Sequence, residues 1–298
     1  MRCKVLHTHT CYDLLSPSFK VIVFDCSLLV KKALAALLQH GVQAAPVWDS
    51  RQQKFVGMLT VTDFIQLILY YFDQSSSVDE ALLEIDELTI GGLRDLERDT
   101  LKCLPNSTIT IQPLESLYNA SRLLIKNHLH RLPLLESTPK SDTIISVLTQ
   151  NKILRFIAAH ETDSELMNRT LKDIGIGTFK NLITETPLID ILKLFIRKRI
   201  SSVPIVDKDG HVTNVYEKYD VLMLAKGEPF YNLDMPVCEA LLQRSQDFTG
   251  IYSCCLTDTL GQVLMSIKSS QVRRFVILED NKLKGLLSLS DILGYLIG

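Results

Sequence analysis

The sequence lacks most features that mark a catalytic, secreted or membrane protein. It has no GxGxxG, no P-loop, no HExxH and no Ser/His/Asp arrangement with the spacing of an enzyme family. No apolar run reaches the 18 or so residues that a membrane span needs, and residues 64–72 fit a buried helix instead. The start, MRCKVLHTHT, has no apolar core of the kind found in a secretion signal. These absences argue against all three classes.

Cysteine pairs and an excess of one charge are also missing. The 7 cysteines are scattered without a CxxC spacing, so we expect reduced thiols in an intracellular protein. With 32 basic and 34 acidic side chains, the net charge of −2 gives no electrostatic reason to expect binding to nucleic acid or to an anionic membrane. Any anion site must therefore come from the local placement of basic groups.

What the sequence contains instead is one pattern repeated four times, which indicates a modular architecture. Its first half is a helix leading into a short strand: LLQHGVQAAPVWD, LIKNHLHRLPLLE, FIRKRISSVPIVD and IKSSQVRRFVILED. Its second half is a strand leading into a helix: VGMLTVTDFIQLI, IISVLTQNKILRFI, VTNVYEKYDVLML and KGLLSLSDILGYL. The key position of this second junction is held by Asp63, Lys152, Asp220 and Asp291, which follow one another at intervals of 89, 68 and 71 residues.

Each unit is predicted to fold as strand, helix, strand, strand, helix, in a chain of the α/β class. In the first unit we expect helices over residues 32–40 and 63–72, and strands over residues 44–48 and 55–60. Gly41 marks the end of the first helix. One aligned position is predicted to be the first residue of a strand, where a missing N–H is tolerated, and it holds Pro46, Pro133, Pro204 and Val276.

The first interval is longer than the others by about 20 residues. The excess falls within residues 73–99, which read as a linker followed by an acidic amphipathic helix. The simplest packing of four units is two pairs, with a break near residues 158–165. We therefore divide the chain into residues 1–162, with units one and two, and residues 163–298, with units three and four.

The aspartate of the second junction has two explanations. Thr60 with Asp63, and Ser288 with Asp291, have the spacing of a capping box, which satisfies free N–H groups at a helix start. In unit three, Glu217 stands where the hydroxyl belongs and the aspartate is kept, which favours a separate task for the carboxylate. A carboxylate at such a junction can accept two hydrogen bonds from a ribose diol, and nearby N–H groups can hold a phosphate.

Basic residues recur just before the first strand of the repeated pattern in three of the four units. They follow predicted helix ends, where cations are favoured in any case. Their recurrence nevertheless favours phosphate binding. The residues are His130, Arg131, Lys198, Arg199, Arg273 and Arg274.

The pattern resembles the CBS domain, which occurs in pairs called Bateman modules, over nearly the whole chain. Four copies, with CYDLLSPSFKVIVFDCSLLVKKA, HRLPLLE, SSVPIVD, YNLD and LSLSDIL, resemble the gamma subunits of AMP-activated protein kinase, in particular the fungal ones. The resemblance implies a disc of two Bateman modules that binds AMP, ADP or ATP near its centre. It implies a catalytic alpha and a scaffolding beta subunit as partners, no metal or catalytic cofactor, no nucleic acid or membrane, and a place in the cytoplasm and nucleus.

The resemblance also implies roles for single residues. Asp63, Asp220 and Asp291 would hold ribose, and Lys152 marks a unit that leaves its own pocket empty, so at most three nucleotides would bind. Positions that meet phosphate in the family match His130, Arg131 and Arg274, with Arg273 in place of the usual histidine. The remaining candidate nucleotide contacts are Thr60, Thr62, Thr149, Thr178, Ser201, Ser202, Arg244, Ser288 and Ser290.

Two departures weaken the pocket of the first unit. Animal relatives carry arginine where this chain has Gln43 and lysine where it has Asn151, so we expect tighter binding in the fourth unit. Three other functions stay open: an enzyme, a CBS-pair regulator of another enzyme or a transporter, and a scaffold with unused pockets. The first lacks a catalytic motif, the second usually has two copies, and nucleotide titration would separate the third from a sensor.

Overall fold

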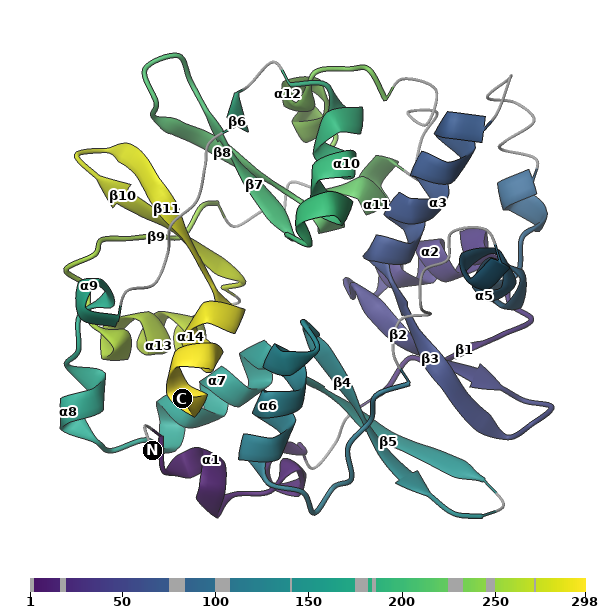
Figure 1. Ribbon diagram of the computed structural model, residues 1–298, viewed down its shortest axis with the longest axis horizontal. Helices are drawn as coiled ribbons and strands as arrows, with labels where there is room; N and C mark the ends of the chain where they lie inside the picture. Colours follow the sequence, from purple (N-terminus) through teal and green to yellow (C-terminus); the bar gives the residue numbers. More distant parts are fainter. Residues whose placement is uncertain are drawn as a thin grey trace.

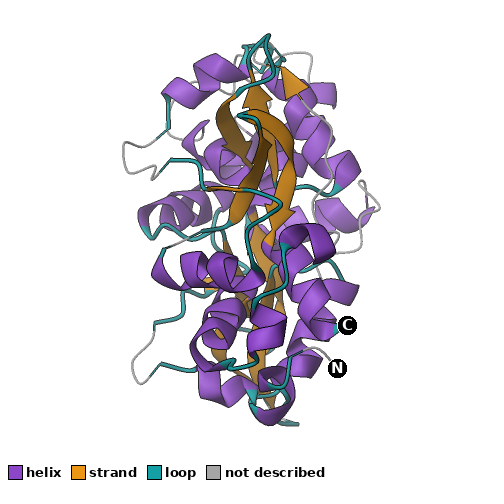
Figure 2. Ribbon diagram, turned by 90° about the vertical axis from the view of Figure 1, so that its left-hand side faces the viewer, coloured by secondary structure: helices purple, strands orange, loops and turns teal. Residues whose placement is uncertain are grey.

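The computed structural model describes residues 3–16, 20–74, 84–99, 108–139, 141–174, 182–183, 186–224, 233–244, 250–270 and 272–298. These residues form four α/β units around a common centre (Figure 1). Seen from the edge, the strands form a middle layer with helices on both sides (Figure 2). The predicted fold class, an α/β chain of four repeats, is confirmed.

The predicted order of strand, helix, strand, strand, helix is found in the units. Unit one consists of β1 (Phe24–Asp25), α2 (Val30–Gln39), β2 (Ala44–Asp49), β3 (Lys54–Thr60) and α3 (Val61–Gln74). Unit two consists of α6 (Leu117–Lys126), β4 (Arg131–Ser137), β5 (Asp142–Thr149) and α7 (Gln150–His160). Its first strand is reduced to a parallel bridge between Ile111 and Leu134.

The second half of the chain repeats this order. Unit three consists of β6 (Leu182–Ile183), α10 (Leu188–Lys198), β7 (Ser202–Val206), β8 (Val212–Glu217), the 3-10 helix η2 (Lys218–Asp220) and α11 (Val221–Leu224). Unit four consists of β9 (Ser253–Cys254), α13 (Leu260–Ser269), β10 (Arg274–Glu279), β11 (Lys282–Ser288) and α14 (Leu289–Ile297). In each unit the last two strands pair antiparallel, and the short first strand of units one, three and four pairs parallel with the middle one.

The remaining elements precede unit one or lie between the units. They are α1 (Val5–Thr8), the 3-10 helix η1 (Cys11–Leu14), α5 (Ile90–Asp99), α8 (Ser164–Met167), α9 (Leu171–Ile174) and α12 (Val237–Leu242). The helix expected after the first unit is found as α5, whereas residues 75–83 of the expected linker lie outside the described residues. Among the described helices, none has the length and apolar character to cross a membrane.

Local sequence signals explain the helix boundaries. Gly41 adopts a φ of 63°, the left-handed conformation that follows a helix end, and α2 ends at Gln39 as predicted. On α10, the buried residues Leu188, Ile191, Leu192 and Phe195 follow the spacing that places side chains on one face of a helix. That apolar face packs against the sheet and against a neighbouring unit.

The aligned prolines do not begin their strands, as we expected, but stand at the third residue. In unit one, β1 pairs with β2 only from Val47 onward, so the preceding Pro46 needs no N–H toward β1. Unit four shows what the proline replaces: the N–H of Val276 donates a hydrogen bond of 2.8 Å to the carbonyl of Tyr252. The prolines are tolerated because pairing with the first strand begins one residue after them, at Val47, Leu134 and Ile205, whereas in unit four it begins at Val276 itself.

The hydrophobic cores do not follow the order of the units along the chain. One core combines residues from unit one, such as Leu37 and Ile65, with residues from unit three, such as Leu192 and Tyr216. A second core combines units two and four in the same way, together with α1 and η1. Neighbouring units in sequence meet through their hairpins instead, since Phe55, Met58 and Leu135 form a smaller cluster between units one and two.

The four units therefore form a closed ring with two kinds of contact. Hairpins join unit one to two and unit three to four, the latter through a bridge between His211 and Lys282. Helices join unit one to three and unit two to four, for example α3 to α10 and α7 to α13. The division of the chain at residues 162 and 163 stays a prediction, because each large core spans both proposed halves.

Candidate functional site

Two cavities lie at the centre of the ring and share one wall. Their volumes are about 460 Å³ and about 710 Å³. Units two, three and four contribute to the shared wall, which is made by His128, His130, Ser201, Arg273, Arg274, Ser288 and Ser290. Five of the six repeated basic residues thus line one or both cavities, whereas Lys198 lines neither.

Most of the predicted site residues line these cavities. They are Thr60, Thr62, His130, Arg131, Thr149, Lys152, Ser201, Ser202, Arg273, Arg274, Ser288, Ser290 and Asp291. Three others, Asp63, Asp220 and Arg244, are not among the lining residues. Thr178 lies outside the described residues.

All three junction aspartates cap a backbone N–H. The carboxylate accepts a hydrogen bond from the N–H three residues earlier, at 2.7 Å for Asp63, 2.7 Å for Asp220 and 2.8 Å for Asp291. In unit three the donor is the N–H of Glu217, so the missing hydroxyl does not remove this half of the capping box. The retention of Asp220 therefore has a structural explanation and does not by itself require a ligand.

The Asp63 carboxylate is closed off by an arginine. Asp63 has no exposed surface, and its Oδ2 lies 3.4 Å from Nη2 of Arg94 on α5. Arg94 also binds Glu97 at 2.5 Å and donates a 2.6 Å hydrogen bond to the carbonyl of Met58. Burial and the negative charge of Asp63 raise the pKa of Glu97. A ribose would have to compete with this buried network.

The Asp220 carboxylate is closed off in a similar way. Nε of Arg244 donates to Asp220 Oδ1 at 2.8 Å, and Nη2 of the same arginine pairs with Oδ2. Arg244 also donates to Asn214 Oδ1 at 3.0 Å and to the carbonyl of Val215 at 2.6 Å. Burial raises the pKa of Asp220, and Arg244 opposes this rise. Arg244, which the resemblance implies as a nucleotide contact, thus pairs with Asp220 in the structure.

Asp291 differs from both because it is exposed and lines the larger cavity. Its Oδ2 accepts hydrogen bonds from the N–H of Ser288 at 2.8 Å and from Ser288 Oγ at 2.7 Å. Within the described part of the chain it forms no ion pair. Its remaining acceptor positions are open to a ligand in the cavity.

Unit two has a cation where the other units have a carboxylate. Thr149 Oγ1 accepts a 3.1 Å hydrogen bond from the N–H of Lys152, so the helix is capped without an acid. The ammonium of Lys152 donates to the carbonyl of Val147 at 3.1 Å, and burial lowers its pKa. An ammonium cannot accept a bond from a ribose hydroxyl, but whether this pocket stays empty remains a prediction.

We expected the six basic residues to stand at helix ends. Of these, only Lys198 and the following Arg199 do so. Helix α6 ends at Lys126 and α13 at Ser269, so the other basic residues begin the next strand or directly precede it. The helix dipole falls off within one turn and so does not account for them. This difference favours a role in binding an anion.

The electrostatics of the centre are those of crowded cations. Burial, together with the nearby charges of Arg131, Lys218 and Arg274, lowers the pKa of His130 to about 4, although a hydrogen bond with Gln150 opposes the change. Burial and Arg273 lower the pKa of Arg131 to about 10. The pKa of Lys218 is lowered to about 8 by burial, with Asp63 opposing the change. Burial is thus the largest cause of each change, and repulsion between neighbouring cations adds to it at His130 and Arg131.

Sequence reasoning missed four residues of this region. Lys218 donates a 3.0 Å hydrogen bond to Thr62 Oγ1, and buried Gln150 accepts one of 3.0 Å from Ser290. Glu217 faces Arg273 and Arg274, and Arg94 reaches Asp63 from a linker helix. Lys218 and Glu217 could have been found, because both lie inside the repeated junction; Arg94 and Gln150 required the fold.

The two departures have structural roles of their own. Gln43 Oε1 accepts a 3.2 Å hydrogen bond from Nη2 of Arg131, joining unit one to unit two. Asn151 Nδ2 donates to the carbonyl of Val272 at 2.9 Å, joining unit two to unit four. Each neutral side chain thus takes part in a contact between units at the centre of the ring.

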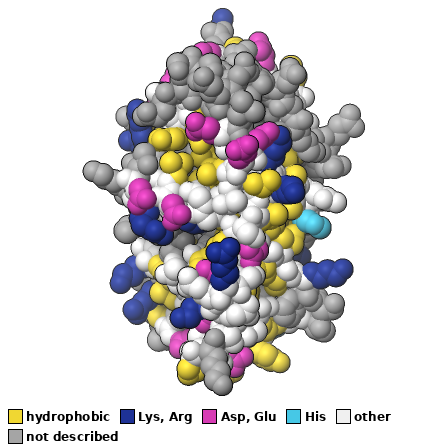
Figure 3. Space-filling model, turned by 90° about the vertical axis from the view of Figure 1, so that its right-hand side faces the viewer, with side chains coloured by type: hydrophobic (Ala, Val, Ile, Leu, Met, Phe, Trp, Pro, Cys, Tyr) yellow, Lys and Arg dark blue, Asp and Glu magenta, His cyan; other side chains and the backbone are white. Residues whose placement is uncertain are grey.

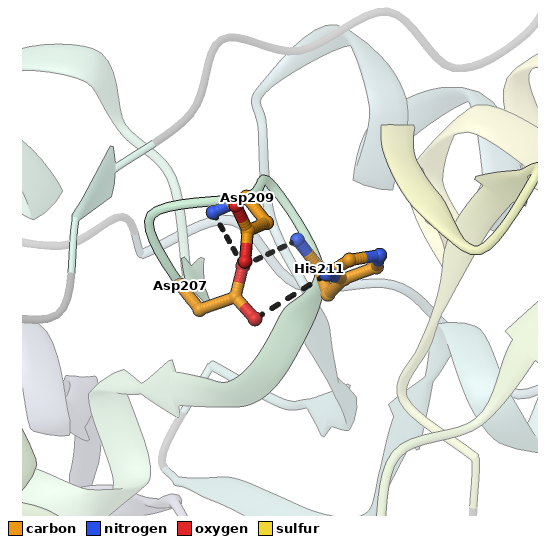
Figure 4. A group of neighbouring side chains, drawn as sticks. All are labelled: Asp207, Asp209 and His211. Atoms are coloured by element: carbon orange, nitrogen blue, oxygen red, sulfur yellow. Dashed lines mark hydrogen bonds and ion pairs between the residues drawn. The ribbon is translucent and has the colours of Figure 1, made fainter.

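Outside the cavities, the described part of the chain contains one group of potential metal ligands. It consists of Asp207, Asp209 and His211, whose ligand atoms lie within 4.8 Å of one another (Figure 4). Asp207 Oδ1 accepts bonds from the N–H of Asp209 at 2.9 Å and of His211 at 2.8 Å, and its Oδ2 lies 3.4 Å from Nδ1 of His211. These bonds are typical of an aspartate turn, here between β7 and β8, and explain the arrangement without an ion.

Known proteins share this architecture. A model of the CBS domain matches residues 12–70, 182–227 and 248–298, which cover units one, three and four. The gamma subunit of 5'-AMP-activated protein kinase from Saccharomyces cerevisiae is 40% identical over 99% of this chain and 92% of its own. The chain belongs to the family of AMP-activated protein kinase gamma subunits. The Kluyveromyces lactis subunit is likewise 40% identical, over 98% of this chain and 90% of its own.

Membership of the gamma subunit family confirms the function predicted from the sequence, a regulatory subunit that is not itself an enzyme. Human gamma-3 is 40% identical over 99% of this chain and 60% of its own length. A solved protein from Methanocaldococcus jannaschii, described as an archaeal homologue of gamma-AMPK, has a TM-score of 0.75 at 14% identity, covering 96% of this chain and 99% of its own. That likeness shows the fold alone, including unit two, which lies outside the ranges matched by the CBS model.

Proposed function

We propose that this gamma subunit binds AMP, ADP and ATP at the centre of the ring and thereby regulates a kinase made with a catalytic alpha and a scaffolding beta subunit. The observation that carries the proposal is the open carboxylate of Asp291, which lines the larger cavity together with Arg273 and Arg274. A ribose acceptor and phosphate-binding cations are thus within one site.

The proposed pose follows from the two cavities. The ribose diol binds Asp291 in the larger cavity, whose volume of about 710 Å³ lies within the usual range for small-molecule sites. The phosphates point to the shared wall, where Arg274, Ser290 and His130 offer donors. Binding an anion there relieves the repulsion among the cations. Regulation then requires that nucleotides differ in their affinity for two states of the kinase complex.

The test is calorimetric titration of the purified chain with AMP, ADP and ATP. We expect one dominant site in unit four and at most three nucleotides in total, with no ribose held at Lys152. No binding of any nucleotide would support a scaffold with unused pockets and overturn the proposal. A ribose seen at Lys152 would overturn the expected stoichiometry alone.

The partners and location are proposed with the same function. Figure 3 shows the edge formed by unit one, where hydrophobic side chains reach the surface between acidic and basic groups, which suits docking to other subunits. We expect a Ser/Thr kinase chain and a beta chain to co-purify from native cells, without nucleic acid or membrane, in cytoplasmic and nuclear fractions. Recovery of this chain alone would contradict the proposed complex.

A further inference from the structure

Glu217 places a negative charge among the cations of the centre. Of the described residues that line the 460 Å³ cavity, it is the only acidic one, whereas the lysines and arginines among them are Arg131, Lys152, Arg155, Lys218, Arg273 and Arg274. It is the last residue of β8, at the junction position where the other units have the hydroxyls of Thr60, Thr149 and Ser288. One unit of four has thus exchanged a neutral group for a carboxylate.

The Glu217 side chain faces the basic pair of unit four. Its Oε1 lies 3.3 Å from Nε of Arg274 and its Oε2 lies 3.6 Å from Nη1 of Arg273. Both distances exceed the usual length of a charge-assisted hydrogen bond. Nε and Nη1 of Arg274 are buried and have no hydrogen-bond partner among the described residues. The carboxylate therefore balances charge but leaves donors available for a better-placed oxyanion.

We propose that Glu217 is an internal counter-ion that takes the place of a phosphate group on Arg273 and Arg274 and limits how much negative charge the site accepts. This inference rests on the proposed nucleotide binding. A phosphate that reaches the two arginines must displace Glu217 or stand beside it, and the resulting repulsion grows with the charge of the ligand. Glu217 thus disfavours ATP more than AMP and sets the preference between them.

Glu217→Gln tests the proposal because it removes the charge and keeps the size. We expect AMP affinity to rise by about three- to tenfold and ATP affinity to rise further, so that the preference for AMP over ATP falls. These gains should shrink at high salt, where charges are screened. Glu217→Asp should keep the original preference. The control is Glu279→Gln, an exposed partner of Lys284 at 2.5 Å on the unit-four hairpin, which should change neither affinity.

Unchanged or weaker AMP binding in Glu217→Gln, or an equal gain in affinity for AMP and ATP, would overturn the proposed role of Glu217 as a counter-ion. Inorganic tripolyphosphate separates this inference from nucleotide binding. If no nucleotide binds either form, but tripolyphosphate raises the melting temperature of Glu217→Gln more than that of the unmodified chain, the proposed function fails and the counter-ion stands. If tripolyphosphate raises both melting temperatures equally, the counter-ion is wrong whatever the nucleotides do.

Discussion

Asp63 in unit one and Asp291 in unit four occupy the same position of the same repeated pattern and have opposite surroundings. Both cap the start of a helix through the N–H three residues earlier. Asp63 has no exposed surface and faces Arg94, whereas Asp291 is exposed in a cavity and has no ion pair with the described residues. Helix capping thus explains the position of the carboxylate in both units. Whether the carboxylate is available to a ligand depends on the element packed against it.

Arg94 comes from α5, in the segment by which the first repeat interval exceeds the others. The extra helix therefore changes the chemistry of unit one without changing its pattern. Asp220 follows the first case, since Arg244 closes it from outside the repeated pattern. Under the proposed function, unit one uses its aspartate for stability and unit four for binding, which single substitutions can test.

The largest effect is expected on stability, for Arg94→Met. Removing the cation leaves Asp63 and Glu97 buried without a counter-charge, which typically lowers the free energy of unfolding by about 3–5 kcal/mol. Arg98→Met, on the same helix with an exposed partner, Asp95, at 3.2 Å, should change it by less than about 1 kcal/mol. Urea unfolding of both variants measures the difference, and equal losses would contradict the buried network.

Asp291→Ala should weaken AMP binding by roughly ten- to a hundredfold, because a lost hydrogen bond to a charged group contributes about 1.5–3 kcal/mol. The matched control is Asp258→Ala, since Asp258 accepts a 2.8 Å bond from the N–H of Cys255 in the same capping geometry, outside the lining of the cavities. Calorimetry should find normal affinity in that control and a much smaller loss for Asp63→Ala. A greater loss for Asp63→Ala than for Asp291→Ala would reverse the comparison.

AMP binding is expected to depend on pH through Lys218. This residue of unit three donates a hydrogen bond to Thr62 of unit one, and its pKa is lowered to about 8. From pH 7 to 9 it loses its charge while the phosphate of AMP stays doubly charged, so AMP affinity should fall by up to about tenfold. Lys218→Met should remove this slope. Burial disfavours the charged form only in the folded state, so the free energy of unfolding should rise with pH between about 8 and 10.5.

The smallest effect is expected for Gln43→Arg, which adds a cation on the side of unit one. The new side chain replaces the acceptor of Arg131 and stands beside it, so part of the gain is lost to repulsion. We expect AMP affinity to rise by up to about fivefold at low salt and to return toward the original value at high salt. Weaker binding at low salt would show that the Gln43 contact matters more than the added charge.

Local features of the fold could be predicted from the sequence because their signals are local. Periodicity located the helices, and the conformation of Gly41 agrees with its place after α2. The aligned prolines were expected to begin their strands but stand third, because the antiparallel pairing with β3 and its equivalents starts two residues before them. The identity of the CBS family followed from the repeated pattern itself.

The sequence could predict which residues belong to the candidate site, but not which of its aspartates is open to a ligand. The junction aspartates and the basic pair Arg273 and Arg274 were found because they recur. Which aspartate is open depends on Arg94 and Arg244, which lie outside the repeated pattern and reach the junction only through the fold. The same holds for Gln150, whose bond to Ser290 joins two units that are far apart in sequence.

The shared cores also bear on how the chain is made. Leu93 and Leu188 belong to one core, and the 94 residues between them include the whole of unit two. At roughly 5–20 residues per second, a ribosome needs about 5–20 seconds to synthesise that stretch. During this time the inner helices of unit one have no partner to cover them, so the nascent chain exposes apolar surface until unit three emerges.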